Sequence, residues 1–157
     1  MAEALVWLVA DELDGLRHDI ARMPDVPDPD RLKSFEELAA ETEGMDGEEP
    51  IPMWRNVDCK PTVWYHDPAE MPKGTPYTNN WYRFPAHTTD DCARQLVLLD
   101  VLAWAAAWQG HAPDVPYIAP NMDLNVQFHR SDTKEEWLLG EGFADVAQDG
   151  LVGFRTR

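Results

Sequence analysis

One carboxylate stands in an apolar run where an ionised group is costly. Asp100 lies midway through Leu96–Trp108, a stretch dominated by leucine, valine, alanine and tryptophan. An ionised aspartate buried among such residues costs several kcal/mol unless it is paired, hydrogen-bonded or protonated. Such a group is a candidate general base or a group that orients a water molecule. The alternative is that the helix exposes Asp100 to solvent, or that Asp100 bonds a neighbouring backbone amide.

Other kinds of catalytic chemistry lack their usual residues. The serines are Ser34 and Ser131, both in polar stretches without a GxSxG motif, so serine hydrolase chemistry is excluded. Cys59 and Cys92 are far apart, and the five histidines form no HxH or HExxH pattern. We therefore expect no metal site, no cofactor, and two reduced thiols in a cytoplasmic protein.

Composition indicates one globular domain with an acidic surface. The chain has 157 residues, 44% of them hydrophobic, and its seven Trp and four Tyr suit a large core or an aromatic pocket. A formal net charge of −16 argues against general binding to nucleic acid or anionic membranes, which needs clustered lysine and arginine. No apolar run reaches the roughly 20 residues of a membrane span.

A helix must position Asp100. Thr88 followed by Asp91 predicts a capped start, the apolar run continues to Gln109, and Gly110 is a natural residue to follow the last helical turn. Because this helix is apolar nearly all round, we expect a sheet to enclose it.

Strands are predicted on both sides of this helix. Aromatic and β-branched residues or period-two alternation indicate five of them, at Ile51–Trp64, Trp81–Phe84, Met122–His129, Trp137–Asp145 and Leu151–Arg157. Gln148-Asp149-Gly150 suits a tight turn between the last two. The predicted class is α+β, with an antiparallel sheet wrapped around one long buried helix.

The first fifty residues are organised differently. The apolar run Ala4–Ala10 fits a short strand or part of a helix, and periodicity does not separate them. Met23–Asp30 alternates proline with acid, which favours extended chain. Ser34, with a glutamate three residues later, predicts a short capped helix at Phe35–Ala40, and Glu41–Pro50 reads as an acidic loop.

Three segments in order resemble the acyl-CoA thioesterase II family. They are Gly15–His18 with Met23–Pro27, Tyr117–Arg130 ending in Phe-His-Arg, and the Glu-Trp-Leu-Leu of Glu136–Leu139. In that family the last two belong to the second of two fused hotdog domains. The resemblance implies a hotdog fold at 51–157 lacking its final strand, a Pro/acid-rich linker with a short helix at 23–50, and the remnant of a preceding hotdog domain at 1–22.

The resemblance also implies an activity and a set of site residues. Members hydrolyse fatty acyl-CoA with an Asp, a Thr or Ser, and a Gln around an attacking water. Asp100 matches the Asp, Asn121 stands where the Thr would be, and Asp123 is a second candidate acid; the Gln would lie in the strand that the chain lacks. The alternatives are a turn residue for Asn121 and a structural strand-end carboxylate for Asp123.

Substrate contacts are expected from basic and aromatic residues. Arg130 and Lys134, together with Arg155 and Arg157, could meet the phosphates of CoA, or simply be charges at a hairpin end. Trp104 lies four residues before Trp108, which is ordinary core spacing and also suits the wall of an acyl tunnel.

The leading hypothesis is thus a thioesterase-like protein that hydrolyses a fatty acyl-CoA by activated-water attack. The alternative is a non-catalytic acyl-binding or oligomerisation module, which the incomplete residue set and the acidic surface favour. Hotdog domains work side by side, so we expect a homodimer that pairs through the sheet edge or the helix side. Ala4–Ala10 is a candidate to cover the unpaired edge.

Overall fold

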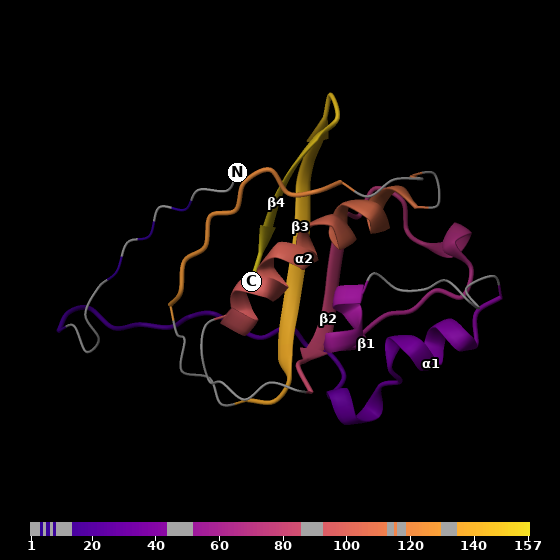
Figure 1. Ribbon diagram of the computed structural model, residues 1–157, viewed down its shortest axis with the longest axis horizontal. Helices are drawn as coiled ribbons and strands as arrows, with labels where there is room; N and C mark the ends of the chain where they lie inside the picture. Colours follow the sequence, from indigo (N-terminus) through magenta and orange to yellow (C-terminus); the bar gives the residue numbers. More distant parts are fainter. Residues whose placement is uncertain are drawn as a thin grey trace.

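An antiparallel sheet with one long helix across it forms the centre of the molecule (Figure 1). The computed structural model describes residues 4, 6, 8, 14–43, 52–85, 93–112, 115, 119–129 and 135–157. The sheet has the order β1-β2-β3-β4, with strands β1 (Asp58–Pro61), β2 (Tyr77–Arg83), β3 (Leu138–Gln148) and β4 (Leu151–Thr156). The long helix is α2 (Ala93–His111), and α1 (Phe35–Ala40) is short. This mixture of helix and antiparallel sheet fits the α+β class predicted from sequence.

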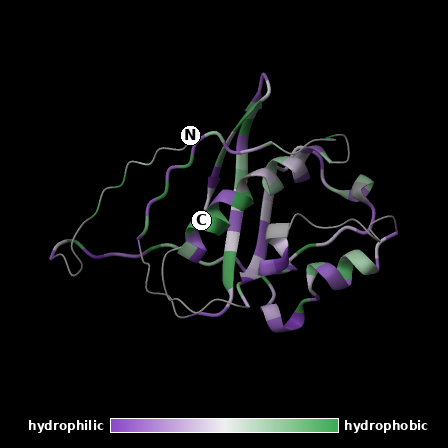
Figure 2. Ribbon diagram, in the orientation of Figure 1, coloured by the Kyte–Doolittle hydropathy of each residue, from purple (hydrophilic) through white to green (hydrophobic). Residues whose placement is uncertain are grey.

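Two glycines let α2 rest directly on β3. A Cβ atom at Gly140 would lie 2.7 Å from Leu102 Cδ1, and one at Gly142 would lie 2.9 Å from the Leu102 carbonyl oxygen. Leu102 is 1% exposed and packs with other buried residues in the main core cluster, namely Val57, Tyr82 and Leu98. Figure 2 shows hydrophobic bands along β3 separated by hydrophilic ones.

The sheet covers one face of α2 and does not enclose the helix in the part of the chain that is described. Leu98 and Leu102 face the sheet and are buried, whereas Leu96 is 43% and Val97 38% exposed. The apolar composition of the helix therefore does not report how much of it the sheet covers. Within the described residues, no helix is both long and apolar enough to cross a membrane.

The hairpin of β3 and β4 is formed as the sequence predicts. Asp149 and Gly150 have positive φ angles of 53° and 82°, the pair that a two-residue turn between right-twisted strands requires. β3 starts at Leu138 and runs on to Gln148, so the hairpin is longer than expected. Its tip extends beyond the rest of the sheet (Figure 1).

The strands before α2 differ in length from the prediction. Residues Pro52–Asn56 form a 3₁₀ helix, so only Asp58–Pro61 of the predicted first strand pairs with its neighbour. β2 begins at Tyr77, before the predicted start at Trp81. Two further 3₁₀ turns lie at Pro29–Arg31 and Pro68–Glu70.

Gly110 does not follow the last turn of the helix, as the sequence predicts. It lies inside α2, which ends at His111, and a Cβ at Gly110 would sit 2.9 Å from Pro76 Cβ. The glycine is thus explained by the close approach of the loop before β2 rather than by a helix cap. The predicted cap at Thr88 and Asp91 lies outside the described residues.

The predicted strand Met122–His129 is wrong in this structure. Residues 121–129 are irregular, and the sheet ladder ends at β4. Alternation of polar and apolar residues indicates an extended backbone with two different faces. It does not show whether a neighbouring strand is present to form hydrogen bonds.

The N-terminal part crosses the side of the sheet away from α2. The capping box of α1 is present, with the Ser34 hydroxyl accepting from the Glu37 amide and the Glu37 carboxylate accepting from the Ser34 amide. Trp81 Nε1 donates to the Pro27 carbonyl at 2.9 Å, and this contact ties the extended linker to β2. The segment Ala4–Ala10 lies largely outside the described residues, so its pairing stays a prediction.

Candidate functional site

The structure brings Asp100 and Asn121 into direct contact. Asn121 Nδ2 donates to Asp100 Oδ1 at 2.6 Å and to the Asp100 backbone carbonyl at 2.7 Å. The two residues come from α2 and from the irregular segment 121–129, 21 positions apart. The two residues that the sequence selected for water activation are therefore neighbours in space.

The orientation of the Asn121 amide follows from its partners. Two oxygens of Asp100 face the amide, so only the NH₂ group can be turned toward them, and both of its hydrogens are used. This leaves Asn121 Oδ1 and Asp100 Oδ2 as acceptors for a further donor. A water molecule has two hydrogens and can donate to both.

Asp100 is exposed, which agrees with the alternative drawn from the sequence and not with a buried carboxylate. Its position on the helix explains the difference. At 100° per residue, Asp100 lies about 200° around α2 from both Leu98 and Leu102, which face the sheet. The carboxylate therefore points to the side of α2 that the sheet leaves uncovered, where its partner Asn121 is exposed as well.

A cavity of about 760 Å³ is lined by sequence neighbours of this pair, and by neither Asp100 nor Asn121. Its walls come from the sheet-facing side of α2, the segment 123–129, the start of β3, and β4 with Arg157. Leu99, directly before Asp100, and Asp123, two residues after Asn121, both line it. The volume falls within the range of pockets that hold small molecules.

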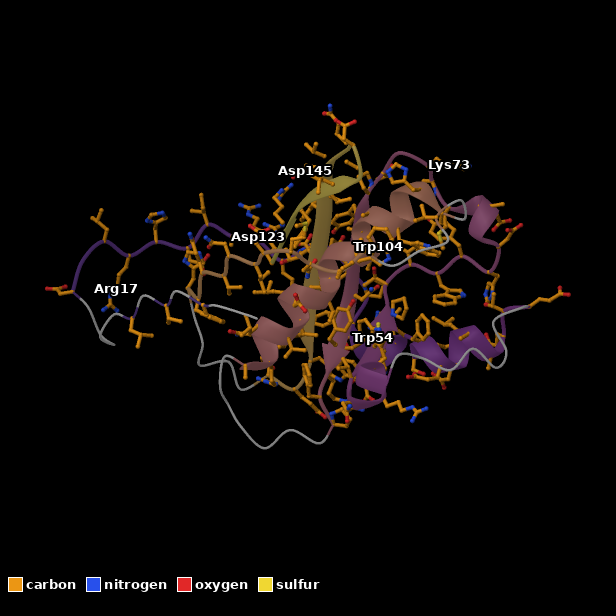
Figure 3. All side chains as sticks on the ribbon, turned by 45° about the horizontal axis from the view of Figure 1, so that its top comes forward. Arg17, Trp54, Lys73, Trp104, Asp123 and Asp145 are labelled. Carbon is orange, nitrogen blue, oxygen red and sulfur yellow. The ribbon has the colours of Figure 1, made fainter. Side chains whose placement is uncertain are left out.

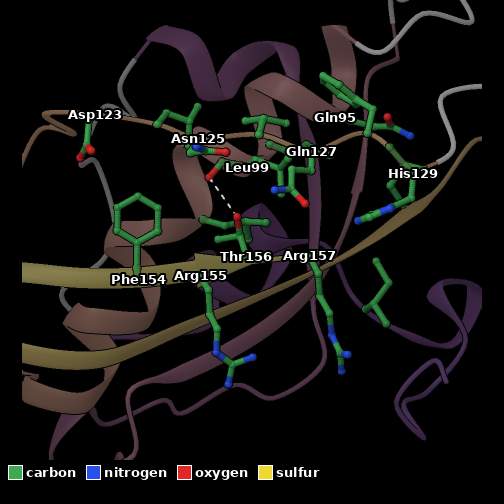
Figure 4. Close-up of a pocket in the computed structure, with 18 of the residues that line it drawn as sticks. Gln95, Leu99, Asp123, Asn125, Gln127, His129, Phe154, Arg155, Thr156 and Arg157 are labelled. Carbon is green, nitrogen blue, oxygen red and sulfur yellow. Dashed lines mark hydrogen bonds between the residues drawn. The ribbon is translucent and has the colours of Figure 1, made fainter. Parts of the chain in front are cut away.

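The cavity combines an apolar interior with polar groups. Leucines from α2 and β3 line it together with Phe154. The polar and charged lining residues are Gln95, Asp123, Asn125, Gln127, His129, Arg155, Thr156 and Arg157. In Figure 4, Asp123 and Phe154 lie toward one end, and Gln95 and His129 lie toward the other. Such a lining suits a ligand with a long apolar part and a few polar atoms.

The remaining residues selected from sequence are not gathered at the pair. Asp123 is exposed and lines the cavity, whereas Trp104 is half-buried and packs against the small cluster of Ala106, Ala107 and Ala144. Figure 3 shows Trp104 on α2 and Asp123 on the separate segment. The role of Trp104 in binding substrate stays a prediction. Arg130 and Lys134 lie outside the described residues.

Arg155 and Arg157 already have acidic partners. Arg155 Nε lies 2.8 Å from Asp145, and Arg157 Nε lies 2.5 Å from Glu141. In Figure 4 both arginine side chains point away from the segment that carries Asn125 and Gln127. Both arginines therefore form ion pairs on the outer face of the sheet.

Thr156 and Phe154 are cavity residues that sequence reasoning did not select. They alternate with Arg155 along β4, and this period places both on the side facing α2. Thr156 Oγ1 lies 3.5 Å from the Leu99 carbonyl oxygen (dashed in Figure 4). The alternation was visible in the sequence, but the approach of Thr156 to Leu99 was not.

The cysteine described by the structure is unsuited to nucleophilic catalysis. Burial first, and then the charge of Glu36, raise the pKa of the Cys59 thiol from 9.0 to about 12. A thiol that stays protonated at neutral pH is a poor nucleophile. No group of three or more His, Cys, Asp or Glu able to hold a metal ion occurs among the described residues.

A comparison with known protein families agrees with these observations. The sequence profile of the acyl-CoA thioesterase C-terminal domain matches residues 20–154, which is most of the chain and includes both Asp100 and Asn121. The match confirms the resemblance drawn from the Phe-His-Arg and Glu-Trp-Leu-Leu segments. The chain belongs to the acyl-CoA thioesterase C-terminal domain family.

Proposed function

We propose that this protein hydrolyses a fatty acyl-CoA thioester with a water molecule held between Asp100 and Asn121. The observation that carries the proposal is the double contact from Asn121 Nδ2 to Asp100, at 2.6 and 2.7 Å. Leu99 and Asp123, close to the pair in sequence, line a cavity of about 760 Å³. Membership of the thioesterase family supports the reaction class. Asp123, on the cavity wall, is the second candidate acid.

The proposed chemistry follows from the two remaining acceptors. Water donates one hydrogen to Asp100 Oδ2 and the other to Asn121 Oδ1, which directs an oxygen lone pair toward the thioester carbonyl carbon. Asp100 takes the proton as the new C–O bond forms. The C–S bond then breaks, and the CoA thiolate receives that proton, giving the free acid and the free thiol.

The cavity is the proposed place for the acyl chain. Leu98 and Leu102 from α2 and Leu138 from β3 give it an apolar wall, and burying an acyl chain there is favourable by about 0.8 kcal/mol per methylene. Trp104, Arg130 and Lys134 remain proposed substrate contacts, the two basic residues for the phosphates of CoA. No cofactor takes part in this scheme.

The proposed fold is a hotdog domain over 51–157. In this fold, more of α2 is covered than by the four strands that the structure describes. The segment 23–50 is the proposed linker, and 1–22 the proposed remnant of a preceding domain. A second copy of the chain is the proposed cover for the exposed Leu96 and Val97, or the partner of the free edge of β4. We place the protein in the cytoplasm.

A non-catalytic acyl-binding module is the alternative. Two observations favour it: Asp100 is exposed rather than held in an apolar pocket, and Asn121 offers no hydroxyl group. In that case the cavity binds the acyl chain without turnover.

Release of free CoA from acyl-CoAs of short to long chain length tests the proposal. The comparison is between wild type, Asp100→Asn and the control Asp149→Asn, which removes a charge at the β3–β4 turn, outside the cavity lining. We expect turnover in wild type, a loss of roughly 10²- to 10⁴-fold in Asp100→Asn, and a small effect in Asp149→Asn. Binding of acyl-CoA by a folded wild type without turnover would support the alternative.

A further inference from the structure

The proposed site lacks a donor for the carbonyl oxygen of the substrate. This oxygen gains negative charge as water attacks, and a hydrogen-bond donor already placed beside it lowers the barrier. Asn121 cannot supply that donor, because both hydrogens of Nδ2 are used by Asp100. The donor must come from another group beside the cavity.

We propose that the Thr156 hydroxyl donates a hydrogen bond to the carbonyl oxygen of the thioester and to the oxyanion that forms from it. The inference rests on the proposed hydrolysis, whose site it completes. Thr156 is half-buried, is the last residue of β4, and lines the cavity. Figure 4 shows its side chain between β4 and α2.

The position of Thr156 relative to α2 suits this role. Its Oγ1 lies 3.5 Å from the carbonyl oxygen of Leu99, the residue directly before Asp100. This distance is longer than the 2.7–2.8 Å common for hydroxyl donors, so the contact is weak. The Leu99 carbonyl, within α2, also accepts its helical hydrogen bond. Turning the hydroxyl from Leu99 to a substrate oxygen therefore costs little.

Thr156 is better fixed than the other donors along the cavity. Three of those donors, Asn125, Gln127 and His129, are exposed on an irregular segment, and Gln95 lies a full helical turn before Leu99. Arg155 and Arg157 also line the cavity, but their side chains are paired with Asp145 and Glu141. Thr156 belongs to a strand whose pairing with β3 is set by Gly142↔Thr156 in the register. Groups on regular elements hold their geometry more precisely than groups on loops.

The step that Thr156 assists is the addition of water. Water oxygen forms a bond to the carbonyl carbon, and the C=O π electrons move to the oxygen that accepts from Thr156. Asp100 receives the proton of the water. When the tetrahedral intermediate collapses, the C=O bond is restored, the C–S bond breaks, and the thiolate takes the proton from Asp100. Thr156 keeps its own hydrogen throughout.

Binding of two stable analogues tests this contact without relying on turnover. One is a 2-oxoalkyl-CoA, which keeps a carbonyl but has a methylene between it and sulfur; the other is the alkyl-CoA thioether of equal length, without a carbonyl. Calorimetry compares wild type, Thr156→Val, Thr156→Ala and Thr156→Ser. The control is Thr62→Val, which removes a half-buried hydroxyl that bonds the Asn79 carbonyl away from the cavity.

We expect wild type to bind the ketone about 5- to 10-fold more tightly than the thioether. Thr156→Val and Thr156→Ala should lose this preference while keeping their affinity for the thioether. Thr156→Ser should retain it, and Thr62→Val should match wild type. In hydrolysis, Thr156→Val should lower kcat by roughly 10²-fold with little change in KM, a split that a purely structural role would not produce.

The outcomes separate this inference from the function on which it rests. An unchanged ketone preference in both Thr156→Val and Thr156→Ala overturns the role of Thr156 and leaves the hydrolysis proposal standing. A Thr156-dependent preference in a protein that hydrolyses no acyl-CoA supports the contact and overturns hydrolysis. A wild type that binds neither analogue overturns both.

Discussion

Two carboxylates on opposite sides of the sheet lie in contrasting surroundings. Asp100, in the apolar run, is exposed and contacts the neutral amide of Asn121. Glu141, on β3, has a side chain only 6% exposed and is held by the Tyr77 hydroxyl at 2.7 Å and by Arg157 Nε at 2.5 Å. The buried acid has its hydrogen bonds satisfied within the structure, whereas the exposed acid has an oxygen left for a ligand.

The contrast between these two acids indicates which side of the sheet can carry chemistry. A buried acid that is paired and hydrogen-bonded is costly to disturb, but both of its oxygens are occupied. An exposed acid held in one orientation by an amide can accept a water molecule without breaking any contact. Function is therefore assigned to the α2 side of the sheet, and the outer face is assigned to stability.

The largest effect is expected from Asn121→Asp. This change places a second carboxylate at the 2.6 Å contact with Asp100, where repulsion drives the two side chains apart. CoA release should fall roughly 10²-fold or more, while the thermal unfolding midpoint changes little because both groups are exposed. Asn125→Asp is the matched control on the same segment. Equal losses in both variants would show that added charge, not the lost contact, is responsible.

The next effect is on stability and lies on the outer face. Glu141→Ala removes the partner of the Tyr77 hydroxyl and should lower the free energy of unfolding by about 1–3 kcal/mol. Asp145→Ala breaks a pair whose side chains are 58% and 60% exposed, and should cost less than about 0.5 kcal/mol. Urea unfolding measures both values. A smaller loss for Glu141→Ala than for Asp145→Ala would remove the contrast between the buried and the exposed acid.

A smaller effect is expected from Tyr77→Phe, with a distinct dependence on pH. Burial first, and then the hydrogen bond and charge of Glu141, raise the pKa of Tyr77 from 10.0 to about 12. The unfolded chain therefore loses this proton at lower pH than the folded protein, so the contribution is complete below pH 10 and is lost as the pH rises toward 12. Unfolding of Tyr77→Phe should show a shallower decline over this range than wild type. Parallel curves would mean that another group titrates.

Local signals allowed the most reliable sequence predictions. The Asp149-Gly150 turn and the capping box of Ser34 and Glu37 each depend on a few adjacent residues, and both are present. The strand expected at Met122–His129 failed because pairing depends on a distant partner. The prediction that a sheet encloses α2 failed for a similar reason, since the composition of a helix does not show which of its faces the sheet covers.

The candidate site was predictable only in part. Asp100 was chosen for its place in the apolar run, and Asn121 from a family resemblance. The structure places the two in contact, and their catalytic roles stay predictions. Asp100 is exposed, the alternative left open from the sequence, because the apolar run contains more hydrophobic residues than the sheet covers. Thr156 gave no local signal, since a threonine at the end of a strand is ordinary until the fold brings it beside Leu99.

A double-mutant cycle on Asp100 and Asn121, measured as kcat for CoA release, tests most directly whether the two side chains hold one water molecule. Asp100→Asn and Asn121→Ala are made singly and together. If one water is held by both side chains, each single change removes most of the rate, and the double variant is no slower than Asp100→Asn alone. Losses in kcat that multiply in the double variant, or full activity in Asn121→Ala, would contradict a water molecule shared by the two side chains.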